Sequence, residues 1–181
     1  HSTLGFILFQ GRLDARAARE PFERSATLGA GESTVMARFA QYCARMGRDP
    51  EAVSAMQRAL ALDPLNPLIH RAVGSIEYAA RRYEASIPAL RRALDMNPRM
   101  SRAHASLGDA LLNLGRIGEA RAEYLLEPSA DFRLAGLAIA EQRAGDPAKA
   151  RSTLDDMVAT QGDRVLYQQA QVLAQLGEIE A

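Results

Sequence analysis

The sequence has 181 residues and carries 22 lysines and arginines against 22 aspartates and glutamates. This balance argues against a protein that holds a nucleic-acid backbone by charge alone. The length suffices to bury a core without disulfides or a structural metal, and the single Cys43 excludes an internal disulfide. No apolar run reaches the roughly 20 residues of a membrane-spanning helix. We expect one helical domain, because helix-favouring alanine, leucine, arginine and glutamate dominate the composition.

The chain repeats itself with a fixed period. Segment 33–66 ends in RALALDPLN and segment 67–100 ends in RALDMNPRM, so that Pro64 and Pro98 stand 98 − 64 = 34 residues apart. A 34-residue period is typical of stacked helix–turn–helix units. In chain order, the approximate units are 1–32, 33–66, 67–100, 101–130, 131–162 and an incomplete 163–181. The period predicts a single array of antiparallel helix pairs over residues 1–181.

Two positions of each unit carry small residues, and a third carries a large apolar one. The eighth position holds Gly5, Ala40, Gly74, Gly108, Ala138 and Ala170, and the twentieth holds Ala18, Ala52, Ser86, Ala120 and Ala150. The twenty-fourth position holds Phe22, Met56, Leu90, Tyr124 and Leu154. Small residues let two antiparallel helices approach closely, and we expect the large ones to fill the space where one hairpin stacks on the next.

Turn residues divide the units into first and second helices. Glycines are predicted to close first helices at Gly47, Gly115, Gly145 and Gly177. Asp49 and Asp146, each before a proline, are predicted N-caps of second helices, and Asn66 is the predicted N-cap of a first helix. Prolines predict irregularity, because Pro21 and Pro88 fall inside second helices and Pro128 ends the fourth unit early.

This pattern resembles the tetratricopeptide-repeat (TPR) family over nearly the whole chain, most closely in 33–66 and 67–100. The resemblance implies an all-α, right-handed superhelical solenoid whose inner face, made mainly by first helices, grips an extended or helical peptide. Against the family pattern, the first unit lacks its opening residues, and Glu127 stands where alanine is usual. The segments DPLNP and YQQAQVLAQLGE are loosely similar to TPR arrays of bacterial signalling proteins, including winged-helix regulators and class III adenylate cyclases.

In the family pattern, positions two, five, six, nine, twelve and thirteen of the first helices line the binding groove. The partner-binding residues that this pattern implies are Arg38, Gln41, Arg45, Arg71, Ser75, Tyr78, Arg102, Asp109, Asn113 and Arg143. Arginines outnumber the single acid, so a neutral chain is predicted to hold a basic groove. Guanidinium groups make bidentate hydrogen bonds to carboxylates, which makes an acidic peptide or protein segment the expected partner, with Tyr78 as an aromatic anchor. The alternative is that these arginines only keep an exposed face soluble.

The sequence offers no combination of nucleophile, base and orienting group. The histidines His1, His70 and His104 all fall at the fourth position of their units. Neighbouring helices pack about 8–10 Å apart whereas zinc ligands lie about 2 Å from the metal, so we expect a packing role for these histidines. Cys43 is expected to be a small buried apolar residue. We therefore expect no enzyme activity, cofactor or metal from these residues.

The function expected from the resemblance is a protein-interaction scaffold. The alternatives are a sensor or partner-binding region of a larger bacterial regulator or cyclase, a recruitment domain of a TPR-fused transferase, and an envelope assembly factor. The carboxylate clamp by which some TPR domains grip chaperone tails is not reproduced, because Ala37, Ala72 and Ser106 stand at its ligand positions. An uncovered apolar face in the last unit would allow self-association. One cysteine fits the cytoplasm, which is the expected compartment, and also the periplasm.

Overall fold

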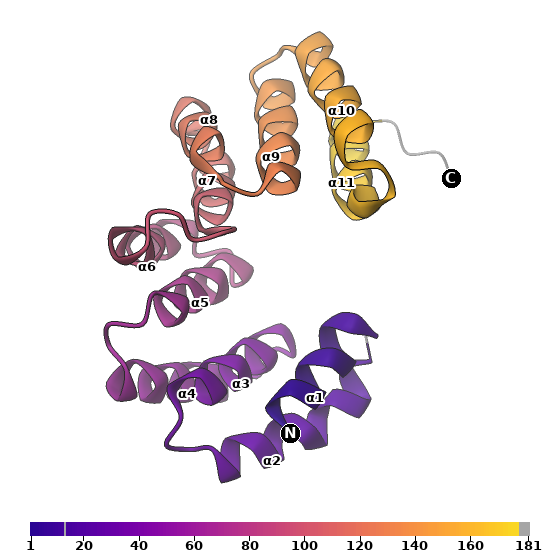
Figure 1. Ribbon diagram of the computed structural model, residues 1–181. Coiled ribbons are helices and arrows are strands. Elements are labelled where there is room, and N and C mark those ends of the chain that lie inside the picture. The colour runs from indigo at the N-terminus through magenta and orange to yellow at the C-terminus, as the bar shows by residue number, and fades with distance from the viewer. Residues whose placement is uncertain (13, 178–181) are drawn as a thin grey trace. The chain divides into compact units, whose positions relative to one another are not determined.

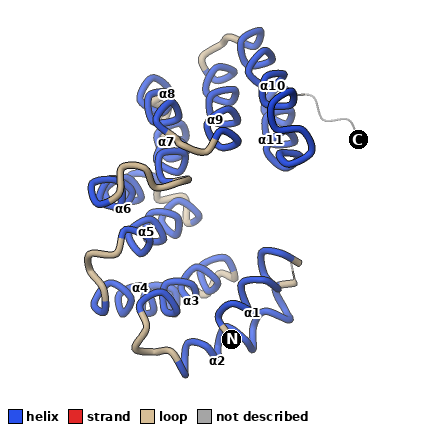
Figure 2. Tube along the Cα trace, in the orientation of Figure 1, coloured by secondary structure: helices blue, strands red, loops and turns tan. Residues whose placement is uncertain are grey.

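The computed structural model describes residues 1–12 and 14–177, and every regular element within these ranges is helical (Figures 1 and 2). The all-α prediction is thereby confirmed. The chain divides into two compact units, His1–Met96 and Asn97–Ala181, which we call unit 1 and unit 2. Each unit is built from helices that pair with their neighbours in sequence, as the 34-residue period predicts.

Unit 1 contains three helical hairpins. Its elements are α1 (Ser2–Phe6), a π-helical segment (Ile7–Gly11), α2 (Ala15–Leu28), α3 (Ser33–Arg45), α4 (Asp49–Leu62), α5 (Pro67–Ala79) and α6 (Tyr83–Met96). Helices α1 and α2, α3 and α4, and α5 and α6 pair most extensively, and the first helices α3 and α5 also pack on each other. Helix α5 begins at Pro67, directly after Asn66, which confirms the predicted N-cap.

Unit 2 follows the same plan with a shorter first hairpin. Its elements are α7 (Ala103–Asn113), α8 (Ile117–Leu126), α9 (Ala130–Arg143), α10 (Pro147–Gln161), a 3-10 segment (Gly162–Val165) and α11 (Leu166–Leu176). Helix α7 pairs with α8, α9 with α10, and α11 packs mainly on α9. Helix α8 ends just before Pro128, as predicted. The expected uncovered face of the last unit falls partly on residues 178–181, which lie outside the described residues.

Glycines allow the helices of a hairpin to touch. A Cβ added at Gly74 would lie 2.5 Å from Cγ of Leu90, and one at Gly108 would lie 2.6 Å from Cε1 of Tyr124. The large residue of the twenty-fourth position therefore fills the space opposite the small eighth residue of its own hairpin. Tyr124 also faces Gly136 in the next hairpin, which agrees with the predicted stacking role. The twentieth residues Ala18, Ala52, Ser86, Ala120 and Ala150 are all buried.

Backbone geometry confirms most of the predicted turns. The predicted glycines Gly47, Gly115, Gly145 and Gly177 all have positive φ, between +68° and +84°. In unit 1, Arg81 occupies the place 34 residues after Gly47 and adopts φ 58° without being glycine. Asn66 and Asp146 cap their helices by accepting from the backbone N–H of Leu68 and Lys149, respectively, both at 3.0 Å.

One predicted N-cap is wrong, and one helix begins inside its unit. Asp49 is the first residue of α4 rather than its N-cap, so its carboxylate lies in the first turn, where it interacts favourably with the helix dipole. Helix α7 begins at Ala103, two residues after the first residue of its unit, because Arg102 adopts φ 68°. The interior prolines Pro21 and Pro88 do not break their helices, since α2 and α6 each run continuously through them.

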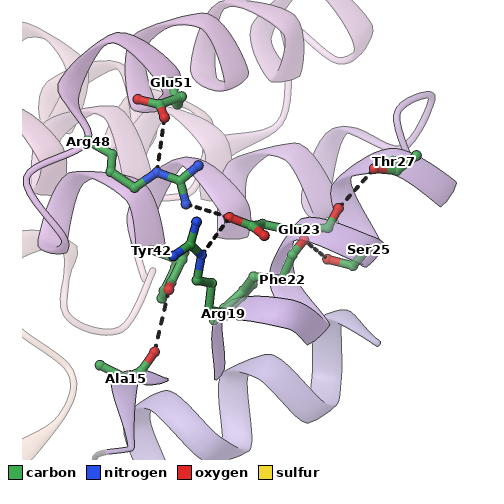
Figure 3. Close-up of polar contacts among 9 residues, drawn as sticks. All are labelled: Ala15, Arg19, Phe22, Glu23, Ser25, Thr27, Tyr42, Arg48 and Glu51. Atoms are coloured by element: carbon green, nitrogen blue, oxygen red, sulfur yellow. Dashed lines mark hydrogen bonds and ion pairs between the residues drawn. The ribbon is translucent and has the colours of Figure 1, made fainter. Parts of the chain in front are cut away.

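An ion network joins the first two hairpins of unit 1 (Figure 3). Glu23 of α2 accepts from Nε of Arg19 at 3.1 Å and from Nη1 of Arg48 at 2.9 Å. Arg48 also donates to Glu51 at 3.0 Å, at the start of α4. Burial opposes ionisation of Glu23, but the hydrogen bonds from Arg19 and Arg48 outweigh it and lower the pKa of this carboxyl. The turn between α3 and α4 is thereby tied to α2.

Candidate functional site

The predicted binding residues of unit 1 lie on one side of α3 and one side of α5. Arg38, Gln41 and Arg45 follow the three- and four-residue spacing of a single helix face, and so do Arg71, Ser75 and Tyr78. Arg38 and Arg45 are exposed, and the other four are half-buried. Because α3 packs on α5, the two rows are neighbours. We call these six residues, together with Phe6 and Phe9, the first-helix face.

The first-helix face carries little negative charge. Within α1, α3 and α5, the only carboxylate is that of Glu77. It is half-buried and accepts from Nε of Arg82 at 2.5 Å, which neutralises it locally. No acid of α1 or α3 therefore offsets the charge of Arg38 and Arg45.

Two of these arginines lie over phenylalanine rings of the first hairpin. The guanidinium carbon of Arg38 is 5.6 Å from the ring centroid of Phe6, and that of Arg45 is 5.6 Å from the ring centroid of Phe9. Such cation–π contacts restrain a flexible side chain. Phe9 is itself held edge-on against Phe22 and Tyr42, at centroid distances of 6.3 and 5.4 Å. The position of Arg45 is thus linked to the core.

The row on α5 is partly occupied by contacts within the protein. The Ser75 hydroxyl donates to the carbonyl of Arg71 at 3.0 Å, so it is engaged by its own helix. The ring of Tyr78 lies 5.4 Å from that of Tyr83, which starts α6, so the expected aromatic anchor packs against the neighbouring helix. These contacts fix the α5 row in place, and Arg71 is the charged member of that row.

In unit 2, the four predicted residues occupy different surroundings. Arg102 is exposed and precedes α7, and its guanidinium carbon lies 4.5 Å from the ring centroid of Phe132. Asp109 is half-buried and accepts from the hydroxyl of Tyr124 at 2.7 Å. Burial raises the pKa of Asp109 to about 6. Asn113 is exposed and donates to the carbonyl of Asp109 at 2.8 Å, and Arg143 is exposed at the end of α9.

Sequence reasoning missed the three phenylalanines beneath the arginines. Phe6, Phe9 and Phe132 fall at the ninth, twelfth and second positions of their units, counted from Gly5 and Ala138 as eighth residues. These are groove positions of the family pattern. Assigning repeat positions in every unit, the first one included, identifies these three residues as groove residues. They belong to hairpins that directly precede or follow those of the arginines.

Two of the three histidines contact turns between hairpins. Nε2 of His70 lies 2.8 Å from the carbonyl oxygen of Pro64, and Nε2 of His104 lies 3.1 Å from that of Pro98. His70 and His104, which stand 34 residues apart at the fourth position of their units, thus contact equivalent proline carbonyl groups. Among residues 1–12 and 14–177, no cluster of three or more potential ligands could hold a metal ion. Cys43 is fully buried, as predicted, and burial raises its pKa to about 11.

Within each unit, helical hairpins pack on one another, which is the architecture of a helical-repeat protein. The sequence profile of the tetratricopeptide repeat matches residues 38–89 and 72–131, so the chain belongs to the TPR family. Proteins of this family generally mediate protein–protein interactions. Among the helices of the described residues, none is both long and apolar enough to cross a membrane.

Solved structures with the same fold cover nearly the whole chain. A thermophilic TPR protein of Thermus thermophilus has a TM-score of 0.82 at 19% identity, with 96% of each chain covered. PilF of Pseudomonas aeruginosa has a TM-score of 0.71 at 19% identity, covering 98% of this chain and 83% of that one. YrrB, described as a TPR protein with an unusual peptide-binding site, has a TM-score of 0.61 at 18% identity, covering 91% of this chain and 87% of that one. At these identities the likeness concerns the fold.

One relative is similar in sequence. The Hsp70-Hsp90 organizing protein of Triticum aestivum is 29% identical over 107 residues, which make up 57% of this chain and 18% of the wheat protein. The chain therefore spans about a fifth of that relative's length.

Proposed function

We propose that the chain is a non-catalytic binding scaffold that holds an acidic polypeptide segment on the first-helix face of unit 1. The observation that carries this proposal is the pair of arginines seated on phenylalanine rings, Arg38 over Phe6 and Arg45 over Phe9. Arg71 extends the same charge onto α5. The nearest carboxylate on these helices, Glu77, is already paired with Arg82.

A stacked arginine suits recognition of carboxylates. The ring restrains the flexible side chain, so less conformational entropy is lost when a ligand binds. The planar N–H groups around the guanidinium edge stay available for bidentate hydrogen bonds. Solubility alone does not require Arg38 and Arg45 to lie over aromatic rings, where the cation–π contacts also stabilise the fold.

The spacing of the two arginines suggests the form of the ligand. Arg38 and Arg45 are seven residues apart on α3, which is about 10 Å along a helix. In an extended polyproline-II segment, side chains three residues apart point the same way and lie about 9 Å apart. The segment that fits therefore carries acidic residues at every third position. The ring of Phe6, which is 40% exposed and lies beneath Arg38, offers contact to apolar residues between the acids.

The wheat relative raises a chaperone tail as a second candidate ligand. At the ligand positions of the carboxylate clamp, however, this chain has Ala37 and Ala72, which are 7% and 3% exposed. Buried methyl groups cannot hydrogen-bond to a terminal carboxylate. The acidic internal segment therefore remains the proposed ligand, and we propose the cytoplasm as its compartment because the single cysteine suits reducing surroundings.

The proposal is tested with a fluorescein-labelled peptide in which glutamate occupies every third position between serines, followed by fluorescence anisotropy. A peptide with glutamine at the same positions is the matched ligand control. Replacing Arg38 and Arg45 by alanine is expected to weaken binding by about tenfold or more, since charge-assisted hydrogen bonds contribute about 1.5–3 kcal/mol each.

The matched control variant removes two arginines from the opposite helix set. Arg91 and Arg92 are exposed on α6, and their replacement by alanine changes the net charge equally. Equal affinity of the wild type for the glutamate and glutamine peptides would contradict the proposal. An equal loss in both double variants would show attraction by net charge only and would contradict it as well.

A further inference from the structure

A fully buried carboxylate lies at the shortened junction of unit 2. Glu127 is 1% exposed and follows the last residue of α8. Its Oε1 accepts from the backbone N–H of Arg102 at 2.9 Å and of Ser129 at 3.1 Å, and its Oε2 accepts from that of Ala105 at 3.1 Å. Three backbone donors therefore converge on one side chain that the repeat pattern would make an alanine.

These bonds supply acceptors at the start of α7. The first N–H groups of a helix have no partner within the helix, and the N-cap of α7 makes no side-chain hydrogen bond. In unit 1, by contrast, Asn66 caps α5 with its own side chain. Glu127 supplies the missing acceptors to α7 from 25 residues further along the chain. The same carboxylate joins the start of α7 to the turn that begins α9, through Ser129.

The junction also holds an uncommon backbone conformation. Arg102 has φ 68°, a left-handed region in which a non-glycine residue is held only by its surroundings. The backbone N–H group of Arg102 donates to Glu127 at 2.9 Å. The carbonyl of Glu127 in turn accepts from Nη1 of Arg133 at 2.8 Å, and the hydroxyls of Ser101 and Ser129 lie 3.2 Å apart.

The side chain of Arg102 extends from this backbone conformation over the ring of Phe132. Its guanidinium carbon lies 4.5 Å from the ring centroid of Phe132, closer than the corresponding contacts of Arg38 and Arg45. Phe132 belongs to α9, whose start is set by the turn that Glu127 also binds. One carboxylate thus positions both members of the stacked pair.

We infer that Glu127 is a positioning residue that holds Arg102 over Phe132 and thereby creates a second acid-recognition point, on unit 2. The ligand class is the same as on the first-helix face, a carboxylate side chain of an acidic segment. This inference rests on the proposed function for the role of Arg102, while the positioning itself is a property of the free protein.

The decisive experiment combines Glu127→Ala with acetate. Alanine removes Cγ and the carboxylate, and acetate has the same carbon and oxygen atoms, so it can refill the site. NMR of the free protein reports the Nε–H resonance of Arg102, which the Phe132 ring current shifts, and the hydrogen exchange of the backbone N–H groups of Arg102, Ala105 and Ser129. In the variant, we expect the Arg102 Nε–H resonance to lose its ring-current shift and the three backbone N–H groups to exchange faster. Acetate should restore both the resonance and the slow exchange, and acetamide should restore neither.

Binding of the glutamate peptide gives the second readout. To read binding on unit 2 by itself, the peptide is measured against proteins that also carry Arg38→Ala and Arg45→Ala. In that background, Arg102→Ala is expected to weaken binding about fivefold, and Glu127→Ala is expected to weaken it as much alone but no further when combined with Arg102→Ala. Additive losses in the double variant would overturn the positioning role. So would an Arg102 resonance that stays in place in Glu127→Ala.

The positioning role of Glu127 can also be tested if Glu127→Ala does not fold. If Glu127→Ala does not fold, Glu127→Gln keeps the volume but directs an amide N–H group at backbone donors, and the same two readouts apply to it. If the wild type does not bind the peptide, the proposed function fails, yet the Arg102 resonance still decides whether Glu127 positions Arg102. The two failures are therefore separable.

Discussion

The hydroxyl of Tyr124 donates to Oδ1 of Asp109 at 2.7 Å across the first hairpin of unit 2. Tyr124 is buried between Gly108 and Gly136, so its hydroxyl reaches the half-buried Asp109 at the edge of the core. Burial is the largest influence on this carboxyl and outweighs the hydrogen bond and the charge of Arg102, which favour ionisation. The pKa of Asp109 is therefore raised from 3.8 to about 6.

Asp109 is predicted to reduce the stability of the fold at neutral pH. Because its pKa is higher in the folded state, the folded protein holds this proton more tightly. The cost is absent below about pH 4, grows between pH 4 and 6, and stays constant above. Asp109→Asn keeps an acceptor for Tyr124 and should raise the free energy of unfolding at pH 7.5 by about 1–2 kcal/mol. Urea denaturation from pH 4 to 8 checks this, and a gain that does not grow with pH would contradict the cause given.

The architecture was predictable because it repeats. Gly74 and Leu90 recur as small and large residues at fixed places in other units, and each recurrence is an independent sign of the same packing. Glu127 could not be predicted in this way. A buried carboxylate is stable only where several donors converge, and its donors come from Arg102, Ala105 and Ser129, which are distant in sequence or lie in a turn.

The sequence predicts the arginines of the candidate site but not the aromatic rings that they contact. Family positions placed Arg38 and Arg45 on one helix face, where the structure has them. The repeat pattern gives Phe6 and Phe9 groove positions, but it does not show that their rings lie beneath arginines of the next hairpin. That contact depends on how α1 and the π-helical segment Ile7–Gly11 pack in space. Arg102 was placed inside a helix because nothing in a local sequence pattern indicates a left-handed arginine.

The glycines that face large side chains are predicted to be intolerant of alanine. Gly74→Ala would place Cβ 2.5 Å from Leu90 Cγ, so the hairpin of α5 and α6 must shift, at a cost of about 1–3 kcal/mol in unfolding free energy. Gly118 is the matched control, because it lies in α8 and a Cβ there would meet nothing within 4 Å. Gly118→Ala should stabilise by about 0.5–1 kcal/mol through helix propensity. Similar effects of both substitutions on chemical denaturation would refute the close approach.

The ion network around Glu23 is predicted to lose its contribution in acid. The pKa of Glu23 is lowered from its ordinary value of 4.5, so its stabilising effect is present above pH 4.5 and disappears as the pH falls through the folded-state pKa. Glu23→Gln should destabilise by less than about 1 kcal/mol at pH 7, since Glu23 is partly exposed and screened by solvent. The difference from wild type should shrink below pH 4.5. Glu20→Gln, at an exposed position of the same helix, controls for the loss of one charge, and an equal effect there would argue against the network.

Arg81 is predicted to be a strained substitute for a turn glycine. It closes α5 at φ 58°, in the place where α3 is closed by Gly47 at φ 68°. A left-handed conformation costs a non-glycine residue about 1 kcal/mol or more, whereas glycine adopts it freely. Arg81→Gly should therefore stabilise unit 1 by up to about 1 kcal/mol, although glycine also gains entropy in the unfolded chain.

Gly47→Ala is the reciprocal change and should destabilise by a similar amount, because its Cβ would meet no other atom and only the backbone strain is added. Thermal and urea unfolding of both variants, compared with Arg81→Ala, separate the backbone effect from loss of the side chain. If Arg81→Gly and Arg81→Ala are equally stable, the turn is not strained.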